Sequence, residues 1–84
     1  MDVEAIKTSI KEAIHQVTGV DTANISDSAS YADDLGLDSL AILEIAVAVE
    51  TQFKFHATDE ELSSIRTLED TVNLVKRRID VEVA

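Results

Sequence analysis

The sequence predicts an all-α fold, a small four-helix bundle of three longer helices and one short helix, with a long loop between the first two helices. Apolar residues recur every three or four positions in separate segments, which is the period of a helix. Hydrophobic residues make up 45% of the chain and aromatic residues only 4%, so the core must consist of Ile, Leu, Val and Ala. The length of 84 residues suffices for one small domain. We therefore expect residues 1–84 to form a single domain whose last few residues fray.

The first helix is predicted over residues 3–17. Asp2 is a suitable N-cap, Glu4 favours the positive N-terminal end, and Gly19 lies where a left-handed C-terminal residue is needed. The apolar residues that fall on one face of this helix are Val3, Ile6, Ile10, Ala13, Ile14 and Val17.

Residues 20–37 are predicted to form a long loop, because the periodicity disappears and small polar residues dominate. A segment of about 18 residues without regular structure is unusual inside a small domain. Such loops are often functional or are held by their own side chains. We expect Ile25 and Tyr31 to pin this loop, with room for a short helical turn.

The second helix is predicted to begin after Asp38, whose carboxylate can cap it, and to run to about Phe53. One apolar stripe should face inward, and a second stripe lies beside Glu44. A domain with four elements cannot bury both sides of this helix, so we expect the second stripe to face a partner. The inward stripe comprises Ile42, Ile45, Ala46, Val49 and Phe53, and the second comprises Leu40, Leu43 and Val47.

A short third helix is predicted from Thr58-Asp59-Glu60-Glu61, which has the spacing of a capping box. Thr67-Leu68-Glu69-Asp70 opens a fourth helix, and we expect the residues after Ile79 to fray. The inward residues of the fourth helix are Leu68, Val72, Val75 and Ile79, and the basic residues expected near its negative end are Lys76, Arg77 and Arg78.

The charge of the chain favours basic proteins as partners. The formal net charge is −10 and the pI is about 4.3, which argues against nucleic acid and anionic membrane surfaces. No Lys or Arg occurs between Lys11 and Lys54. The acids in that interval are Glu12, Asp21, Asp27, Asp33, Asp34, Asp38, Glu44 and Glu50.

Most enzyme and metal sites are excluded by the composition. The absence of Cys rules out disulfides, thiolate nucleophiles and the usual structural zinc sites. His15 and His56 do not form a metal-binding motif, and no EF-hand or phosphate-binding glycine loop occurs. No apolar run approaches the ~20 residues of a membrane span, and the first residues lack a signal or transit pattern. We therefore expect a cytoplasmic protein without a metal site or membrane span.

Ser39 is the residue most able to carry chemistry. A Ser at the start of a helix is ordinarily a capping or first-turn residue. No neighbouring His or Lys in the sequence could activate its hydroxyl, which argues against a Ser hydrolase. Because it follows a long loop at a helix end, Ser39 is better interpreted as an attachment point for a large group.

The chain resembles the acyl carrier proteins over nearly its whole length. Residues 33–40 read D-D-L-G-L-D-S-L, which is similar to the attachment motif of that family, and the F-x-F, D-E-E and T-L-E-D-T-V segments follow in family order. The resemblance implies that Ser39 carries phosphopantetheine, donated from coenzyme A by a phosphopantetheinyl transferase, and that Asp38 helps to present it. The thiol of that cofactor would let a chain without Cys form thioesters.

The resemblance also implies a non-enzymatic, monomeric carrier of acyl intermediates in fatty-acid, polyketide or specialised lipid biosynthesis. Its partners would be acyl-transferring and ketosynthase-type enzymes with basic docking surfaces. The docking residues implied are Leu40, Leu43, Glu44 and Val47, and those lining a space for the acyl chain are Ile42, Ile45, Ala46 and Val49.

Several positions depart from the common fatty-acid pattern of the family and make the docking helix less acidic. These positions are Ala41, Ile42, Thr51, Gln52, Lys54 and His56. They favour a specialised carrier, in a polyketide or lipid-modifying pathway, over a housekeeping one.

Two alternatives remain at this point. A helical interaction module without the arm is disfavoured because Ser39 and Asp38 are both present, and peptidyl or aminoacyl carriers more often have a Gly-Gly-x-Ser motif.

Overall fold

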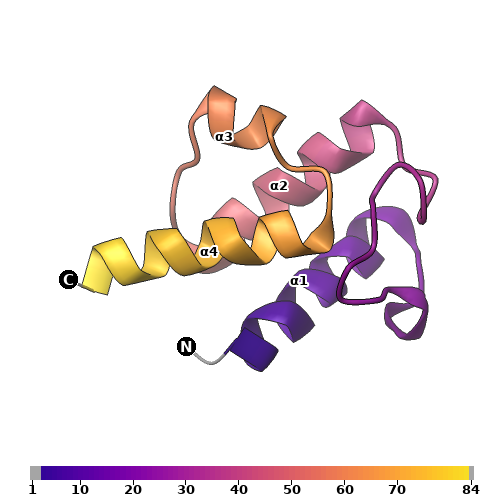
Figure 1. Ribbon diagram of the computed structural model, residues 1–84, viewed down its shortest axis with the longest axis horizontal. Coiled ribbons are helices and arrows are strands. Elements are labelled where there is room, and N and C mark those ends of the chain that lie inside the picture. The colour runs from indigo at the N-terminus through magenta and orange to yellow at the C-terminus, as the bar shows by residue number, and fades with distance from the viewer. Residues whose placement is uncertain (1–2, 84) are drawn as a thin grey trace.

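The computed structural model describes residues 3–83, with side chains for residues 3–79, and confirms the predicted all-α bundle (Figure 1). Three helices have 15 or 16 residues and one has five. The elements are α1 (Val3–Thr18), the 3₁₀ turn η1 (Thr22–Asn24), α2 (Ser39–Phe53), α3 (Asp59–Ser63) and α4 (Leu68–Val83). Helix α1 packs against both α2 and α4, and α3 lies at an angle to the long helices.

The core lies between the three long helices and is mainly aliphatic, as the composition predicts, with Tyr31 and Phe55 as its buried aromatic residues. Phe53 and Ile79, which were expected to face inward, are only half-buried against it. The buried residues of the long helices are Ile6, Ile10, Ala13 and Ile14 of α1, Ile45, Ala46 and Val49 of α2, and Leu68, Thr71, Val72, Leu74 and Val75 of α4. None of the helices in the part of the chain that the structure describes is long and apolar enough to cross a membrane.

The loop between α1 and α2 is pinned as predicted. Ile25 and Tyr31 are 3% and 0% exposed, so both side chains are held in the core. The Tyr31 hydroxyl forms a hydrogen bond with Thr71 Oγ1 of α4, and the Tyr31 backbone N–H donates to the carbonyl of Arg66 at 3.0 Å. The loop is therefore fixed to the first turn of α4 and to the segment that precedes it.

Several helix ends follow the predicted capping signals. Gly19 has a φ of 79° directly after α1, and Thr58 and Glu61 form the predicted capping box of α3. The expected N-cap Asp2 lies outside the described residues. Helix α2 ends at Lys54, which has a left-handed conformation that the sequence alone did not predict.

The end of α4 corrects one prediction. The backbone is helical to Val83, so Lys76, Arg77 and Arg78 lie in the middle of the helix and not near its negative end. Because the helix continues past them, these cations cannot neutralise its last carbonyl groups, and Arg78 instead contacts Glu61 of α3. Fraying of the last few residues stays a prediction.

Candidate functional site

A tight turn brings the chain from the core to the start of α2. The Leu37 N–H donates to the carbonyl of Tyr31 at 2.9 Å, and the Gly36 N–H donates to that of Ala32 at 3.2 Å. Gly36 has a φ of 67°, a left-handed conformation that disfavours residues with a Cβ. The turn leads directly from buried Tyr31 to Asp38 at the surface.

Asp38 and Ser39 have different roles at the start of α2. Asp38 Oδ1 accepts a hydrogen bond from the Ala41 N–H at 2.9 Å, which confirms it as the N-cap. Ser39 is the first helical residue, is exposed, and its hydroxyl has no hydrogen-bond partner among the described residues. The ordinary capping role of a helix-start Ser is therefore taken by Asp38, and the Ser39 hydroxyl is free for another use.

The environment of Ser39 fits an attached phosphate ester. Ser39 is exposed to solvent, so a transferase can reach it. The N-terminus of a helix carries a partial positive charge and N–H groups without helical partners, which together favour an anionic group. A phosphodiester on the Ser39 oxygen would lie at this positive end of α2.

A hollow of about 400 Å³ adjoins Ser39 between α2 and α3. Its lining is mainly apolar, and the residues that line it are Ser39, Ile42, Leu43, Asp59, Leu62, Ser63 and Ile65. Of the four residues expected to line an acyl space, Ile42 reaches the hollow. The other three, Ile45, Ala46 and Val49, lie in the closed core.

Sequence reasoning missed the contribution of the α3 region to this hollow. Leu62 and Ile65 line it opposite α2, and their spacing of three residues was the available signal. That spacing indicates a shared apolar side but does not show which helix it meets, and Ile65 lies beyond the end of α3.

The outer side of α2 exposes the second apolar stripe, as predicted. Leu40, Leu43 and Val47 are 63%, 45% and 49% exposed, high values for large aliphatic side chains. Glu44 is also exposed and has no partner among the described residues. We call these four residues the α2 face. Their role in docking stays a prediction.

Two other acids, Asp27 of the loop and Glu50 of α2, are already bonded within the molecule. Asp27 lies 3.2 Å from Lys7 Nζ and 2.9 Å from Lys11 Nζ, and these contacts, the Lys11 hydrogen bond first, lower the pKa of the Asp27 carboxyl. Glu50 is half-buried and accepts a hydrogen bond from a backbone N–H at 2.7 Å. Glu44 is thus the acid of the α2 face that remains available to a partner.

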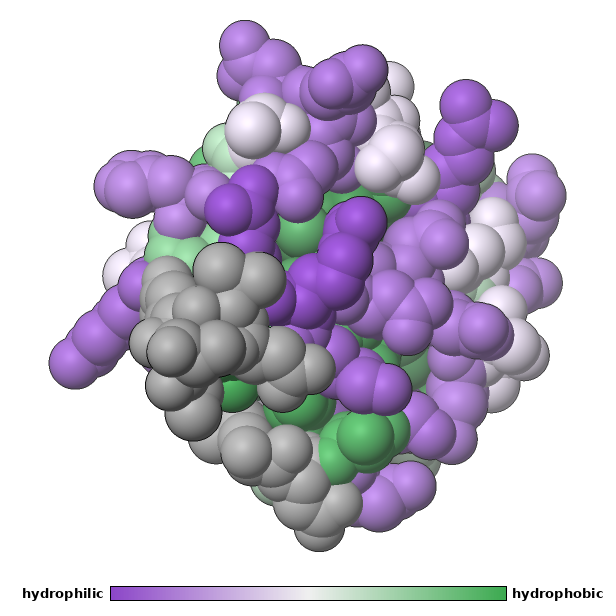
Figure 2. Space-filling model, turned by 60° about the vertical axis from the view of Figure 1, so that its left-hand side comes forward, coloured by the Kyte–Doolittle hydropathy of each residue, from purple (hydrophilic) through white to green (hydrophobic). Residues whose placement is uncertain are grey.

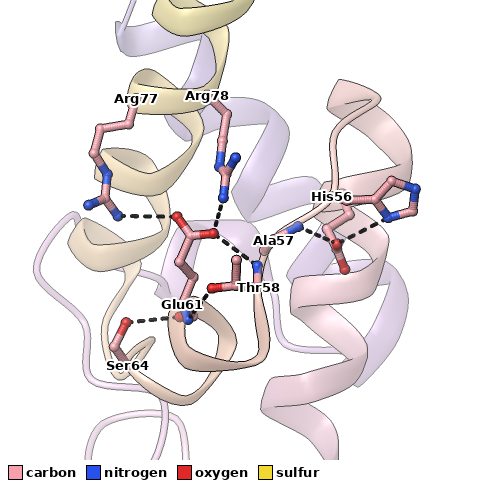
Figure 3. A network of polar contacts seen from close by, with 8 residues as sticks. His56, Ala57, Thr58, Glu61, Ser64, Arg77 and Arg78 are labelled. Atoms are coloured by element: carbon pink, nitrogen blue, oxygen red, sulfur yellow. Dashed lines mark hydrogen bonds and ion pairs between the residues drawn. The ribbon is translucent and has the colours of Figure 1, made fainter.

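Helix α3 is fastened to α4 through Glu61 (Figure 3). Glu61 Oε1 accepts hydrogen bonds from the Thr58 N–H at 2.9 Å and from the Arg78 guanidinium. The Arg77 guanidinium lies 4.0 Å from Oε2. The backbone N–H of Thr58 is the main cause that lowers the pKa of Glu61, followed by Arg78. This carboxylate holds α3 in place beside the hollow.

Replacing Glu61 by Gln is expected to lower stability at pH 7 and to have a smaller effect at pH 3. The pKa of Glu61 is lower in the folded state than its usual 4.5. The carboxylate therefore stabilises the fold above the unfolded pKa, and this contribution is lost as pH falls through the folded pKa. Urea unfolding of both proteins at the two pH values measures the difference. Glu60→Gln, in the same turn but outside the network, is the matched control. An equal difference at both pH values would contradict the assignment.

The two histidines do not form a metal site. Both His15 and His56 are exposed. Within residues 3–79, no group of three or more potential ligand side chains is placed to hold a metal ion.

Comparison with known proteins points to one family. Residues 8–75 match the family model described as "Phosphopantetheine attachment site". The chain is 38% identical to the meromycolate extension acyl carrier protein of Mycobacterium leprae over 74 residues, 88% of this chain and 64% of that protein. It is 35% identical to the acyl carrier protein of Acidothermus cellulolyticus over 72 residues, 86% of each chain. It is 33% identical to that of Petrotoga mobilis over 82 residues, 98% of this chain and 96% of the other.

Proposed function

The chain belongs to the acyl carrier proteins, and from this premise we propose that Ser39 bears the phosphopantetheine arm and that residues 1–84 form a single carrier domain. As a member of this family, the protein is a carrier with covalently bound phosphopantetheine, and it is not itself a catalyst. The observation that carries the Ser39 proposal is its exposed hydroxyl, which Asp38 frees from capping.

In the proposed loading step, Ser39 gives its hydroxyl proton to a base of the transferase, and its oxygen forms a bond to phosphorus. The phosphoanhydride bond of coenzyme A breaks and the nucleotide leaves, so that the transferase exchanges one phosphorus–oxygen bond for another. Asp38 keeps the helix start ordered while Ser39 reacts, and the N-terminus of α2 stabilises the charge of the ester. When bound, the group supplies the thiol that this Cys-free chain lacks.

The hollow beside Ser39 is proposed to shelter the first part of an acyl chain. Ile42, Leu43, Leu62 and Ile65 provide its apolar lining. Burying one CH₂ group contributes up to ~0.8 kcal/mol. Ile45, Ala46 and Val49 lie behind this lining in the core, so we propose that they contact the acyl chain only if α3 moves outward.

The proposed partners are a phosphopantetheinyl transferase and acyl-transferring or ketosynthase-type enzymes, which meet a monomeric carrier in the cytoplasm. The α2 face would enter their basic docking surfaces, with its aliphatic side chains setting specificity.

We propose a specialised lipid or polyketide pathway. The names of the mycobacterial relatives, which refer to meromycolate extension, support lipid synthesis, although this chain spans only 64% of their length.

Mass spectrometry tests the attachment directly. The protein is incubated with coenzyme A, magnesium and a broad-specificity phosphopantetheinyl transferase, and the modified peptide is mapped. The expected result is a gain of one arm on the peptide that contains Ser39. A folded protein that gains no arm, or gains it on another peptide, would overturn the proposal.

Glu44→Lys is expected to weaken binding to a ketosynthase-type enzyme roughly five- to tenfold at low salt. The substitution replaces an unpaired acid of the α2 face by a base, so that attraction to the basic groove becomes repulsion. The effect should shrink as salt rises. Titration of the holo protein against the enzyme at two ionic strengths measures it. Glu12→Lys on α1, which changes the net charge equally, is expected to have a much smaller effect. Equal effects of the two variants would show that docking does not use the α2 face.

A further inference from the structure

Lys54 occupies a backbone position better suited to glycine. Its φ and ψ are 58° and 53°, and its N–H donates to the Glu50 carbonyl to end α2. The left-handed conformation is strained for a residue with a Cβ, and Gly is the usual choice there. The chain uses Gly19 for the same purpose after α1, with a φ of 79°. A lysine at such a position points to a use for its side chain.

The fold itself makes little use of the Lys54 side chain. It is exposed and has no ion pair among the described residues. Its charge lies at the negative end of α2, which offsets part of the strain. A Lys in an unstrained position of the last turn would give the same benefit, so this effect does not explain the choice.

Lys54 directly follows the last residue of α2, Phe53, and lies near one of the exposed aliphatic residues of the α2 face. Leu40 and Val47 are spaced by seven residues, which places them along one side of the helix, and Val47 and Lys54 line the same hollow. This hollow of about 310 Å³ connects this end of the α2 face to the chain that follows. The residues that line it are Val47, Glu50, Thr51, Lys54, Phe55 and His56.

The two ends of α2 differ in charge. Asp38 and Glu44 lie near its start, whereas Lys54 lies about 22 Å from Ser39 along the helix axis at the rise of an α-helix. Glu50, the acid nearest to Lys54 in sequence, points inward to the Ala57 N–H at 2.7 Å and is half-buried. Glu50 therefore does not pair with Lys54, whose exposed side chain lines the same hollow.

The other polar neighbour is His56, whose Nδ1 lies 3.9 Å from Glu50 Oε2 (Figure 3). Its ring is otherwise fully exposed. Hydrophilic side chains also cover most of the surface seen in Figure 2, with hydrophobic ones between them. Lys54 places a positive charge at the C-terminal end of α2, on a chain with a formal net charge of −10.

We propose that Lys54 is a docking residue that selects partner enzymes with an acidic side chain at the far end of their groove. This inference rests on the proposed function, since it extends the docking role of the α2 face. A groove with basic residues near Glu44 and an acid facing Lys54 would accept α2 in one direction only. A groove that is basic along its whole length would be disfavoured by repulsion.

Pairwise charge exchange tests the proposal. The probe is a ketosynthase-type condensing enzyme with a basic groove, together with variants in which each basic groove residue is changed to Glu, one at a time. Each is titrated at low salt against the holo forms of the wild type, Lys54→Gly, Lys54→Glu, Lys54→Arg and Glu44→Lys. Mass spectrometry first verifies that every form carries its arm, so a failure of loading is seen separately.

The expected result is one groove position whose change to Glu tightens binding of the wild type and Lys54→Arg about two- to fivefold, the range for exposed ion pairs. Lys54→Glu should show the opposite preference and Lys54→Gly none. Lys54→Gly should also melt at a higher temperature, because the strain is relieved.

If Glu44→Lys changes binding but no groove position distinguishes the residue-54 variants, the inference is wrong while the docking proposal stands. If neither residue matters, both are wrong. A lower melting temperature of Lys54→Gly, without any charge preference, would assign Lys54 to stability alone.

Discussion

Ser39→Ala is expected to abolish loading with phosphopantetheine completely while leaving the helices intact. The hydroxyl oxygen is the atom that forms the ester, and Ala has none. The fold should not suffer, because Asp38 provides the N-cap through Ala41 and the Ser39 hydroxyl has no partner within the described residues. Ala is also a better helix former than Ser. Intact mass after treatment with coenzyme A and the transferase measures loading, and far-UV circular dichroism with urea unfolding measures the fold.

Ser63→Ala is the matched control for this experiment. Ser63 lines the same hollow as Ser39, is exposed, and its hydroxyl donates only to the carbonyl of Asp59 at 2.7 Å. Its loss should leave loading at the level of the wild type. Loading that persists in Ser39→Ala would show that another residue accepts the arm. Loading that is lost in Ser63→Ala would show that the hollow, and not the hydroxyl of Ser39, limits the reaction.

The sequence was sufficient for features that depend on neighbours along the chain. Helix periodicity gave the extent of α2, and the cap at Asp38 and the capping box at Thr58 follow from side chains that bond to backbone three residues away. Because Asp38 caps the helix, the Ser39 hydroxyl is not needed as a cap. The exposure of Leu40 was also predictable, because a helix with two apolar stripes cannot be covered on both sides in so small a domain.

Features that depend on contacts between distant segments were not predictable in this way. Arg78 was expected to serve the end of its own helix, but it pairs with Glu61, 17 residues earlier in the chain. The division of the inward α2 residues into those in the closed core, such as Ile45, and Ile42 at the hollow depends on where α3 lies. The left-handed conformation of Lys54 was hidden because it breaks the usual preference for glycine.

Tyr31→Ala is expected to cost about 3–5 kcal/mol of unfolding free energy, the range for removing a buried aromatic side chain. For 84 residues, total stability at the usual ~0.05–0.15 kcal/mol per residue is about 4–13 kcal/mol, so the loss is a large share of it. Tyr31 is fully buried, and its hydroxyl bonds to Thr71 of α4. Urea unfolding followed by circular dichroism measures the change.

Tyr31→Phe separates the ring from its hydroxyl. It should cost only about 0.5–1.5 kcal/mol, the net value of one hydrogen bond, because Thr71 Oγ1 keeps its bond to the Thr67 carbonyl at 3.2 Å. Burial raises the pKa of Tyr31 to about 12, above its unfolded value. The stabilisation from the neutral phenol is thus present below pH 10 and is lost as pH rises through 12, so both costs should be constant between pH 6 and 9.

The same two variants connect the core to the attachment site. The carbonyl of Tyr31 accepts the Leu37 N–H at 2.9 Å, in the turn that leads to Asp38 and Ser39. If the ring anchors this turn, Tyr31→Ala should load more slowly than the wild type even at a temperature where it is folded, and Tyr31→Phe should load at the wild-type rate. Equal stability of the Ala and Phe variants would show that the ring does not pin the loop. Equal loading rates of folded Tyr31→Ala and the wild type would show that the turn holds Ser39 without this anchor.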